Sequence, residues 1–352
     1  MFRVLRGAVP SIVALLLGLL AGSVLMWALG LNPFNVFYAL FDGALGTKYG
    51  QSSVLTYMSS YILLALAFLI PGKAGIWNVG GQGQVFIGGI TAALVVVFVP
   101  MPIILWPLVA VIAACITGAG LAAVSGLLEA YRNASAIVTT IMLNYVAAPF
   151  SSFLLYYVIV LRVPSVAQNQ YVIFSSAATL PGIPYFNASI MFLVAILVAI
   201  GTKYFLQRSS LGYNIRAVGL GPKQAESKGI NPKTIKVIAM LIGGAVAGLA
   251  GAGDVLSTGH GCYLVACYQD NFAAGWFGGE GFAGIAVALV AANDPIGSIF
   301  SGIFFSILAA GTVSVGQNIY VVWAMQGIII VFMAAPYLST KVLNLGGKKR
   351  WT

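Results

Sequence analysis

The chain has 352 residues, of which 60% are hydrophobic and only 7% are charged. Soluble domains carry about 25% charged residues, so this composition excludes an ordinary water-soluble fold and makes the bilayer much of the protein's solvent. The net charge of +10 could indicate a nucleic-acid partner. It is better explained by Lys and Arg residues that set membrane topology, and no nucleic-acid partner is expected.

The apolar runs continue for about 20 residues, the length that spans a bilayer as a helix, whereas barrel strands alternate in polarity over about 10 residues. We therefore predict an all-α, polytopic membrane bundle with about ten transmembrane helices. The first run follows Arg3 and Arg6 like a signal peptide, but it is too long and lacks a clear cleavage site, so we expect it to stay. The predicted spans are 9–31, 52–71, 76–99, 103–128, 135–161, 188–206, 236–257, 272–292, 296–316 and 319–338.

Basic residues predict the orientation. If the N-terminus is cytoplasmic and the spans alternate, only Lys48 and Arg162 of the 17 basic residues fall outside. Positive charge is enriched on the cytoplasmic side, so both termini are predicted to be cytoplasmic and the protein to be a multi-pass protein of the cell membrane. The whole chain, 1–352, is predicted to be one transmembrane domain with a cytoplasmic loop at 207–236 and an external loop at 162–187.

The two loops differ in character. The external loop is rich in proline and aromatic residues, for example Pro164, Pro181 and Tyr185, and is predicted to be an ordered surface segment. The internal loop is the longest basic segment, and Pro222 suits the first position of a short helix that ends at Gly229. This short helix is either a connector anchored on anionic lipid or a docking element for a cytosolic partner.

Residues 72–89 and 275–290 interrupt apolar runs with glycine and polar side chains. Each contains Gly-Gly-[Gln/Glu]-Gly, at 80–83 and 278–281, in spans predicted to run in opposite directions. Interrupted segments at corresponding positions are typical of broken helices that line a transport cavity. The alternative is tight helix packing through glycines, with the amides reaching a nearby interface. The predicted substrate pathway comprises Trp77, Asn78, Gln82, Gln84, Asn144, Glu280 and Phe282, with Glu280 the one carboxylate placed well inside a span.

No catalytic constellation is present in the sequence. His260, the single histidine, has no nucleophile partner nearby, no phosphate-binding loop occurs, and no row of acidic or basic residues marks a proton or sodium relay. We therefore expect no enzyme activity, no metal and no cofactor in this chain, and any transport energy must come from another subunit. Cys115 is expected to be a packing residue, while Cys262 and Cys267 are either a small external disulfide or two idle thiols.

Four segments in order resemble the permease subunits of ABC transporters for nucleosides and simple sugars, a branch of the group that includes ribose and branched-chain amino acid permeases. The segments are KAGIWNVGGQGQVFIGG (73–89), SAIVTTIMLNY (135–145), LGYNIRAVGLGPKQAESKGI (211–230), and GGAVAGLAGAGDV (243–255) with GFAGIAVALVAANDPIG (281–297). The family has Glu where this chain has Gln82, Ala-Ala where it has Gln224-Ala225, and Leu-Leu-Gly where it has 289–291. The first departure puts a charge-based substrate contact at Gln82 in doubt.

The resemblance implies a homo- or heterodimer of permeases in membrane lipid, a cytosolic ABC ATPase that binds ATP and Mg²⁺, and an extracytoplasmic substrate-binding lipoprotein. It also implies that 216–230 is the coupling helix, through Arg216, Gly219, Pro222, Ala225, Glu226 and Gly229. The predicted function is import of nucleosides or related simple sugars by alternating access, with nucleosides favoured by the NVGGQGQ segment. The alternatives are an ion-coupled secondary transporter, for which titratable residues in the spans are too few, and a membrane-embedded enzyme or scaffold.

Overall fold

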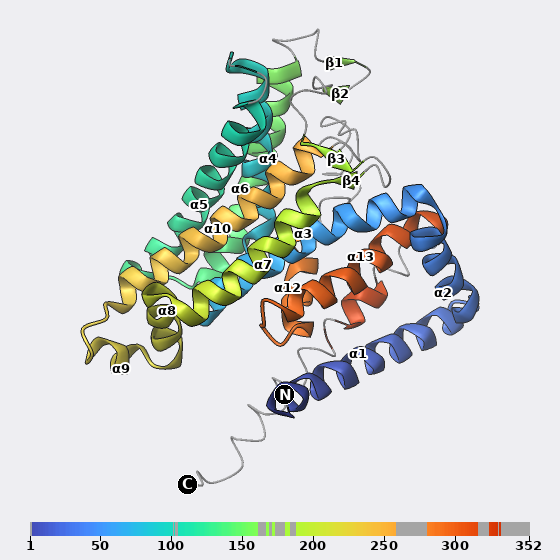
Figure 1. Ribbon diagram of the computed structural model, residues 1–352, viewed down its shortest axis with the longest axis horizontal. Coiled ribbons are helices and arrows are strands. Elements are labelled where there is room, and N and C mark those ends of the chain that lie inside the picture. Colours follow the sequence, from blue (N-terminus) through green and yellow to red (C-terminus); the bar gives the residue numbers. More distant parts are fainter. Residues whose placement is uncertain are drawn as a thin grey trace.

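A computed structural model of the chain describes residues 2–100, 102, 105–160, 167–168, 171–172, 180–183, 188–257, 280–315, 324–329 and 331. These residues are mainly helical (Figure 1). In chain order the helices are α1 (Phe2–Ala28), α2 (Pro33–Phe41), the π-helical η1 (Asp42–Gly46), α3 (Lys48–Lys73), α4 (Gly81–Phe98), α5 (Trp106–Arg132), α6 (Ala136–Phe153), the π-helical η3 (Leu154–Val160), α7 (Met191–Arg208), α8 (Ser210–Leu220), α9 (Pro222–Glu226), α10 (Pro232–Leu256), α12 (Glu280–Val290) and α13 (Gly297–Val315).

The described part of the chain is a bundle of apolar helices, as predicted. Six of them are long and apolar enough to cross a membrane, and a bent pair formed by Leu15–Ala28 and Pro33–Gly46 makes a possible seventh span. The six match the predicted spans from 52–71 to 236–257, while α12 and α13 are shorter helices within 272–292 and 296–316. The predicted span 319–338 lies largely outside the described residues, so the count of ten stays a prediction.

Helix α3 is the centre of the bundle. Every residue from Met58 to Pro71 is buried, because α10, α13, α12 and α7 pack around it. In Figure 1, α3 and α7 lie between a group formed by α4, α5, α6 and α10 and a group formed by α1, α2, α12 and α13. A helix that is apolar on all sides belongs in such a position.

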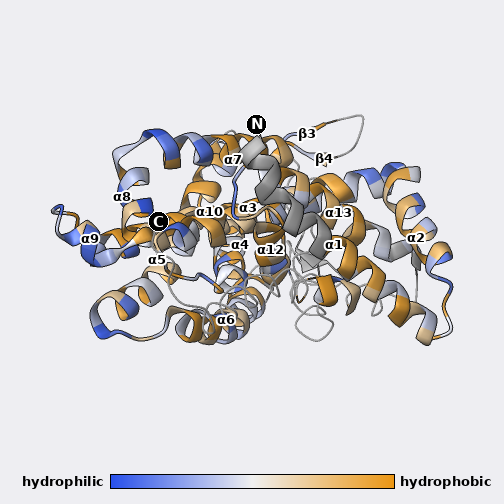
Figure 2. Cartoon of the chain, turned by 90° about the horizontal axis from the view of Figure 1, so that it is seen from below, coloured by the Kyte–Doolittle hydropathy of each residue, from blue (hydrophilic) through white to orange (hydrophobic). Residues whose placement is uncertain are grey.

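The outer helices present apolar side chains to their surroundings. Ile112 and Ile116 on α5, Val146 on α6 and Leu197 on α7 are all exposed. Figure 2 shows that apolar residues colour most of the helices, whereas hydrophilic residues gather on α8 and α9. Exposed apolar belts of this extent are stable only when lipid covers them, which agrees with the membrane assignment from composition.

Two turns share the sequence Gly-x-Asn-Pro. In the first, Gly30 has a φ of +77° and ends α1, and the Asn32 side chain accepts a hydrogen bond from Phe34 N at the start of α2. In the second, Gly229 (φ +79°) follows α9, and Asn231 caps α10 in the same way. Glycine tolerates this left-handed conformation, while Pro at the first helical position fixes the next start. The bend of 118° between α1 and α2 was not predicted from the sequence.

The short strands and the short helices lie at opposite ends of the bundle (Figure 1). In and just after the loop that was predicted to be external (162–187), β1 (Ala167–Gln168) pairs with β2 (Tyr171–Val172), and β3 (Gly182–Ile183) pairs with β4 (Ala188–Ser189), both antiparallel. Most of this loop, including Pro164 and Tyr185, is outside the described residues. So are His260, Cys262 and Cys267, whose predicted states remain predictions.

Gly248 brings three helices into backbone contact. A Cβ atom placed on Gly88 of α4 or on Gly118 of α5 would lie only 2.7 Å or 2.8 Å from the Gly248 Cα atom of α10. A Cβ on Gly248 itself would collide with the Ala114 carbonyl oxygen. Close approach through small residues is the usual way to pack helices in a bilayer, where the hydrophobic effect does not drive helices together.

We expect Gly248→Ala to lower the melting temperature of the detergent-purified protein, because the added methyl group forces α5 away from α10. Overpacking of this kind costs about 1–3 kcal/mol. The matched control is Gly120→Ala, also on α5, where no atom lies within 4 Å of the added Cβ. A Gly248→Ala protein that melts at the same temperature as Gly120→Ala would contradict the packing described here.

Candidate functional site

The chain between α3 and α4 returns into the bundle without forming a helix. Residues 74–80 follow the end of α3, and the Asn78 side chain donates a hydrogen bond to the Ala67 carbonyl at 3.2 Å, which places this segment beside the last turns of α3. Gly81, the first residue of α4, lies against Leu64 of α3. Helix α4 therefore begins deep in the protein, where its first backbone N–H groups have no intrahelical acceptor.

Two buried amides close this break. Asn78 donates to Gln84 Oε1 at 2.9 Å, and Gln84 donates to Asn78 Oδ1 at 2.8 Å. Asn78 Oδ1 also accepts from Gly80 N at 3.2 Å. Both side chains are buried, so an unpaired amide here would carry the full cost of its desolvation.

Asn144 completes the pairing from α6. Its Oδ1 atom accepts from Gly83 N at 2.8 Å, and its Nδ2 atom donates to the Val79 carbonyl at 3.1 Å. Thr140, one turn earlier, bonds the Ala136 carbonyl of its own helix. On α6, Asn144 thus bonds the break in the chain, whereas Thr140 bonds its own helix.

The N-terminus of α12 meets the N-terminus of α4. Gly281 N donates to Gln82 Oε1 at 2.7 Å, and a Cβ atom on Gly281 would lie 2.6 Å from Gln82 N. Gly284 packs against Leu64, the same residue that contacts Gly81. The two glycine-rich segments singled out in the sequence therefore meet beside the centre of α3. Helix N-termini carry partial positive charge, so the junction favours negative groups.

Two carboxylates lie at this junction. Glu280, the first residue of α12, is 8% exposed, and Asp254 near the end of α10 is also 8% exposed. Asp254 accepts a hydrogen bond from the Ser60 hydroxyl of α3, and Tyr61 lies close enough to both carboxylates for their charges to act on it. The sequence analysis missed Asp254, although an acidic residue within a predicted span is itself a functional signal.

The structure brings five of the seven predicted pathway residues into one cluster: Asn78, Gln82, Gln84, Asn144 and Glu280. Trp77 lies at its edge, packed edge-to-face on Phe68 with ring centroids 5.4 Å apart. Phe282, by contrast, is 45% exposed on α12. We use the name junction cluster for Asn78, Gln82, Gln84, Asn144, Asp254 and Glu280.

The predicted coupling segment contacts the start of the break. Helix α9 begins at Pro222 as predicted but ends at Glu226 and not at Gly229. The expected coupling helix 216–230 is divided at Gly221, so Arg216 and Gly219 belong to α8 (Ser210–Leu220). A Cβ on Gly219 would collide with the Lys73 carbonyl and lie 3.3 Å from Gly75 N, so the end of α8 sits directly on the α3–α4 connection. Ala225 is buried, whereas Pro222, Glu226 and Gly229 are exposed on the far side.

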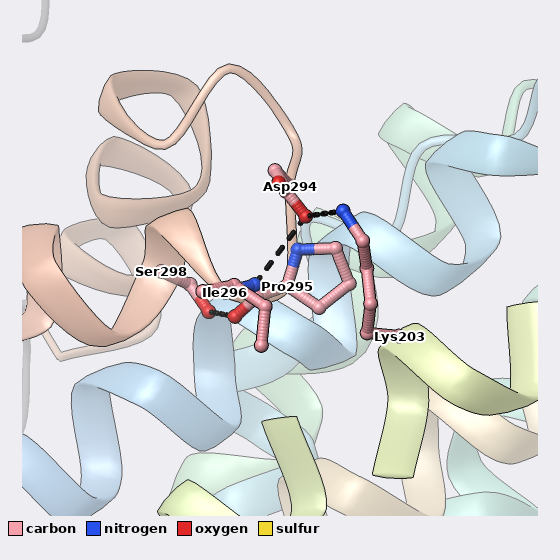
Figure 3. A network of polar contacts seen from close by, with 5 residues as sticks. All are labelled: Lys203, Asp294, Pro295, Ile296 and Ser298. Carbon is pink, nitrogen blue, oxygen red and sulfur yellow. Dashed lines mark hydrogen bonds and ion pairs between the residues drawn. The ribbon is translucent and has the colours of Figure 1, made fainter. Parts of the chain in front are cut away.

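Ion pairs tie the helices together at the α8–α9 end. Lys203 of α7 contacts Asp294 in the α12–α13 turn at 2.6 Å, and Asp294 also accepts from Ile296 N at 3.3 Å (Figure 3). Lys236 of α10 pairs with Glu129 of α5 at 2.9 Å. The Lys203 and Asp294 side chains are 32% and 36% exposed, so this pair is partly screened by water and contributes at most about 1 kcal/mol.

Comparisons with known proteins point to one class. Residues 51–334 match the family described as "Branched-chain amino acid transport system / permease component". The chain is 30% identical to a nucleoside ABC transporter permease protein of Lactococcus lactis, over 96% of this chain and 93% of the relative. It is 30% identical to a glucose ABC transporter permease protein of Haloferax volcanii (92% and 86%), and 28% identical to a guanosine ABC transporter permease protein of Bacillus subtilis (99% and 99%).

We expect Asn78→Ala to destabilise the protein strongly, because it leaves the Ala67 carbonyl, Gly80 N and the Gln84 amide without their partner. Each buried polar group left unpaired costs about 1–3 kcal/mol. The measurement is the melting temperature in detergent, compared with Asn35→Ala, which changes an exposed asparagine on α2.

The double variant Asn78→Ala/Gln84→Ala should lose less stability than the sum of the two single variants, because the two amides bond each other. Additive losses, or an Asn78→Ala protein as stable as Asn35→Ala, would show that the amide pair does not close the break.

Proposed function

The chain belongs to the family of branched-chain amino acid transport system permease components, and from this premise we propose that it carries nucleosides or related simple sugars across the cell membrane by alternating access. The observation that carries the proposal is the set of relatives with nucleoside, glucose and guanosine in their names, which this chain matches over 86–99% of their lengths. These cargoes are neutral and share vicinal hydroxyl groups. A polar junction inside an apolar bundle suits such cargo.

The proposed importer has further subunits. A cytosolic ABC ATPase would bind ATP and Mg²⁺, a second permease, identical or different, would complete the pathway, and an extracytoplasmic lipoprotein would deliver the cargo. This chain would itself bind no cofactor and catalyse no reaction. Family membership supports these partners in general terms.

An ion-coupled transporter is disfavoured. Such a transporter needs a row of acidic or basic residues as a proton or sodium relay, and Asp254 and Glu280 are the only buried carboxylates in the described helices.

We place the α8–α9 end in the cytoplasm, with both chain termini on that side. The support is the basic residues at this end, among them Arg208, Arg216, Lys223 and Lys228, together with the positive-inside rule. The whole chain would be one permease domain, with 207–236 as the coupling loop and 162–187 facing outward. The exposed Pro222, Glu226 and Gly229 would face the ATPase, and Arg216, Gly219 and Ala225 would hold the segment on the bundle.

In the proposed mechanism, movement of the ATPase is passed to both helices that begin at the junction. Gly219 of α8 lies on the Lys73 carbonyl, so a shift of α8 displaces residues 74–80 and with them the start of α4. Helix α7, which leads directly into α8, holds the end of α12 through Lys203 and Asp294. Reorientation of α4 and α12 about α3 would open the junction first to one side of the membrane and then to the other.

The test is uptake by proteoliposomes that contain this chain with its ATPase, second permease and binding protein. ATP supplied on the side of the membrane that carries the ATPase should drive accumulation of guanosine or glucose. A non-hydrolysable ATP analogue supplied in the same way should not. Accumulation by the chain alone under a sodium or proton gradient would instead establish the secondary transporter.

We expect Gly229→Val and Arg216→Glu to reduce ATP-driven uptake at least about tenfold while leaving membrane insertion intact. Valine at a φ of +79° is strained by about 1–2 kcal/mol and would change the exit from α9, and glutamate reverses a charge beside the docking surface. The matched control is Gly201→Val on α7, where no atom lies within 4 Å of the Cβ.

The readouts are uptake and the amount of ATPase that co-purifies with the permease. Normal uptake with normal ATPase recovery in both variants would remove the docking role from this segment.

A further inference from the structure

Asp254 is a buried carboxylate that the closure of the α3–α4 break does not use. It is 92% buried, one oxygen accepts from the Ser60 hydroxyl, and the other, Oδ2, has no hydrogen-bond partner among the described residues. An ionised carboxylate accepts up to about four hydrogen bonds and donates none. A buried acceptor of this strength is costly to keep unless something donates to it.

A second polar group at the same place is independently unfulfilled. Gln82 is only 4% exposed, and its Oε1 atom is bound to Gly281 N at the start of α12. Its Nε2 donor has no partner in the described part of the chain. The Gln82 side chain therefore lies beside Glu280, because its other amide atom is bound to the next residue, Gly281. Among the described residues, the junction thus offers a free acceptor on α10 and a free donor on α4, two helices that pack against each other beside α3.

The surrounding groups define the chemistry. The charges of both Asp254 and Glu280 act on Tyr61, so the two carboxylates lie near the same residue of α3. Tyr61, like Ser60, is a hydroxyl-bearing side chain of α3. Carboxylate acceptors beside an amide donor match a neutral molecule that presents adjacent hydroxyl groups, because each hydroxyl can donate to a carboxylate and accept from an amide N–H.

We infer that Asp254, held by Ser60 and joined by Gln82 and Glu280, binds the vicinal hydroxyl groups of the cargo at the junction of α4 and α12. The inference rests on the proposed function, since it names the part of the cargo that this chain recognises. Asp254 selects for hydroxyl donors, and Ser60 is a positioning residue that orients its carboxylate.

The test compares cargoes that differ only in these hydroxyls, in the reconstituted importer described above. Guanosine is compared with 2′,3′-dideoxyguanosine, and glucose with 2-deoxyglucose, each at a concentration that saturates the binding protein. Asp254→Asn keeps the size of the side chain but replaces an acceptor oxygen with a donor. We expect the preference for the hydroxylated compound to fall about threefold to tenfold, the range of one or two hydrogen bonds.

Ser60→Ala leaves the carboxylate in place and should lower the same preference in the same direction by a smaller factor. If Asp254→Asn fails to assemble, Ser60→Ala decides the question. Glu129→Gln is the matched control, because it makes the same carboxylate-to-amide change in the ion pair with Lys236, outside the junction. Its preference should equal that of the unmodified importer.

An unchanged preference in Asp254→Asn or, where that variant does not assemble, in Ser60→Ala overturns the inference, provided that cargo-loaded binding protein still stimulates ATP hydrolysis. An equal loss in Glu129→Gln overturns it too. In both cases the proposed function stands, because the unmodified importer still accumulates the hydroxylated compound. If the unmodified importer accumulates none of the four compounds with ATP, the proposed function itself fails and the inference falls with it.

Discussion

A helix that begins in the middle of an apolar bundle must find partners for its first backbone groups, and this requirement organises the structure. Helix α4 begins beside Leu64 of α3, among buried residues of the bundle. Asn144 accepts from Gly83 N and Asn78 accepts from Gly80 N, while the Gln84 amide holds the Asn78 side chain in place. Because those amides come from both sides of the break and from α6, the same bonds fix how α4 and α6 lie against α3.

The glycines make this polar arrangement geometrically possible. A side-chain amide reaches a backbone group on another helix only if the two backbones are close. Gly83 permits this between α4 and α6, since a Cβ atom there would lie 2.8 Å from Asn144 Oδ1, and Gly88, Gly118 and Gly248 permit the direct backbone contacts of α4, α5 and α10. Gly281 likewise lets the start of α12 approach Gln82. Small residues therefore contribute twice in this protein, through the dispersion contacts they permit and through the hydrogen bonds that close approach makes possible.

Composition and periodicity were enough to predict a membrane bundle, and the glycine-rich interruptions were enough to predict a break before α4. What they could not provide was the use of each amide. Asn144 bonds Gly83 across 61 positions of sequence, so its partner depends on tertiary packing alone. The bend after α1 was predictable in principle, since its Gly-x-Asn-Pro turn repeats at 229–232. Asp254 was missed because it lies near the end of an apolar run, where a charge can equally reach the interface.

The two connections between the α8–α9 end and the junction differ physically, and the proposed mechanism depends on that difference. Gly219 touches the Lys73 carbonyl by direct backbone contact. When α8 moves toward the end of α3, this contact therefore pushes the α3–α4 connection without any side chain having to rearrange. Lys203 and Asp294 form a partly exposed ion pair whose separation costs little, because water can replace each partner. A movement of α8 would therefore shift the start of α4 rigidly while α12 can follow or detach. Gln82 and Gly281 join α4 and α12 at the junction. Unequal movement of the two helices at the α8–α9 end would therefore open the site at which the carboxylates lie.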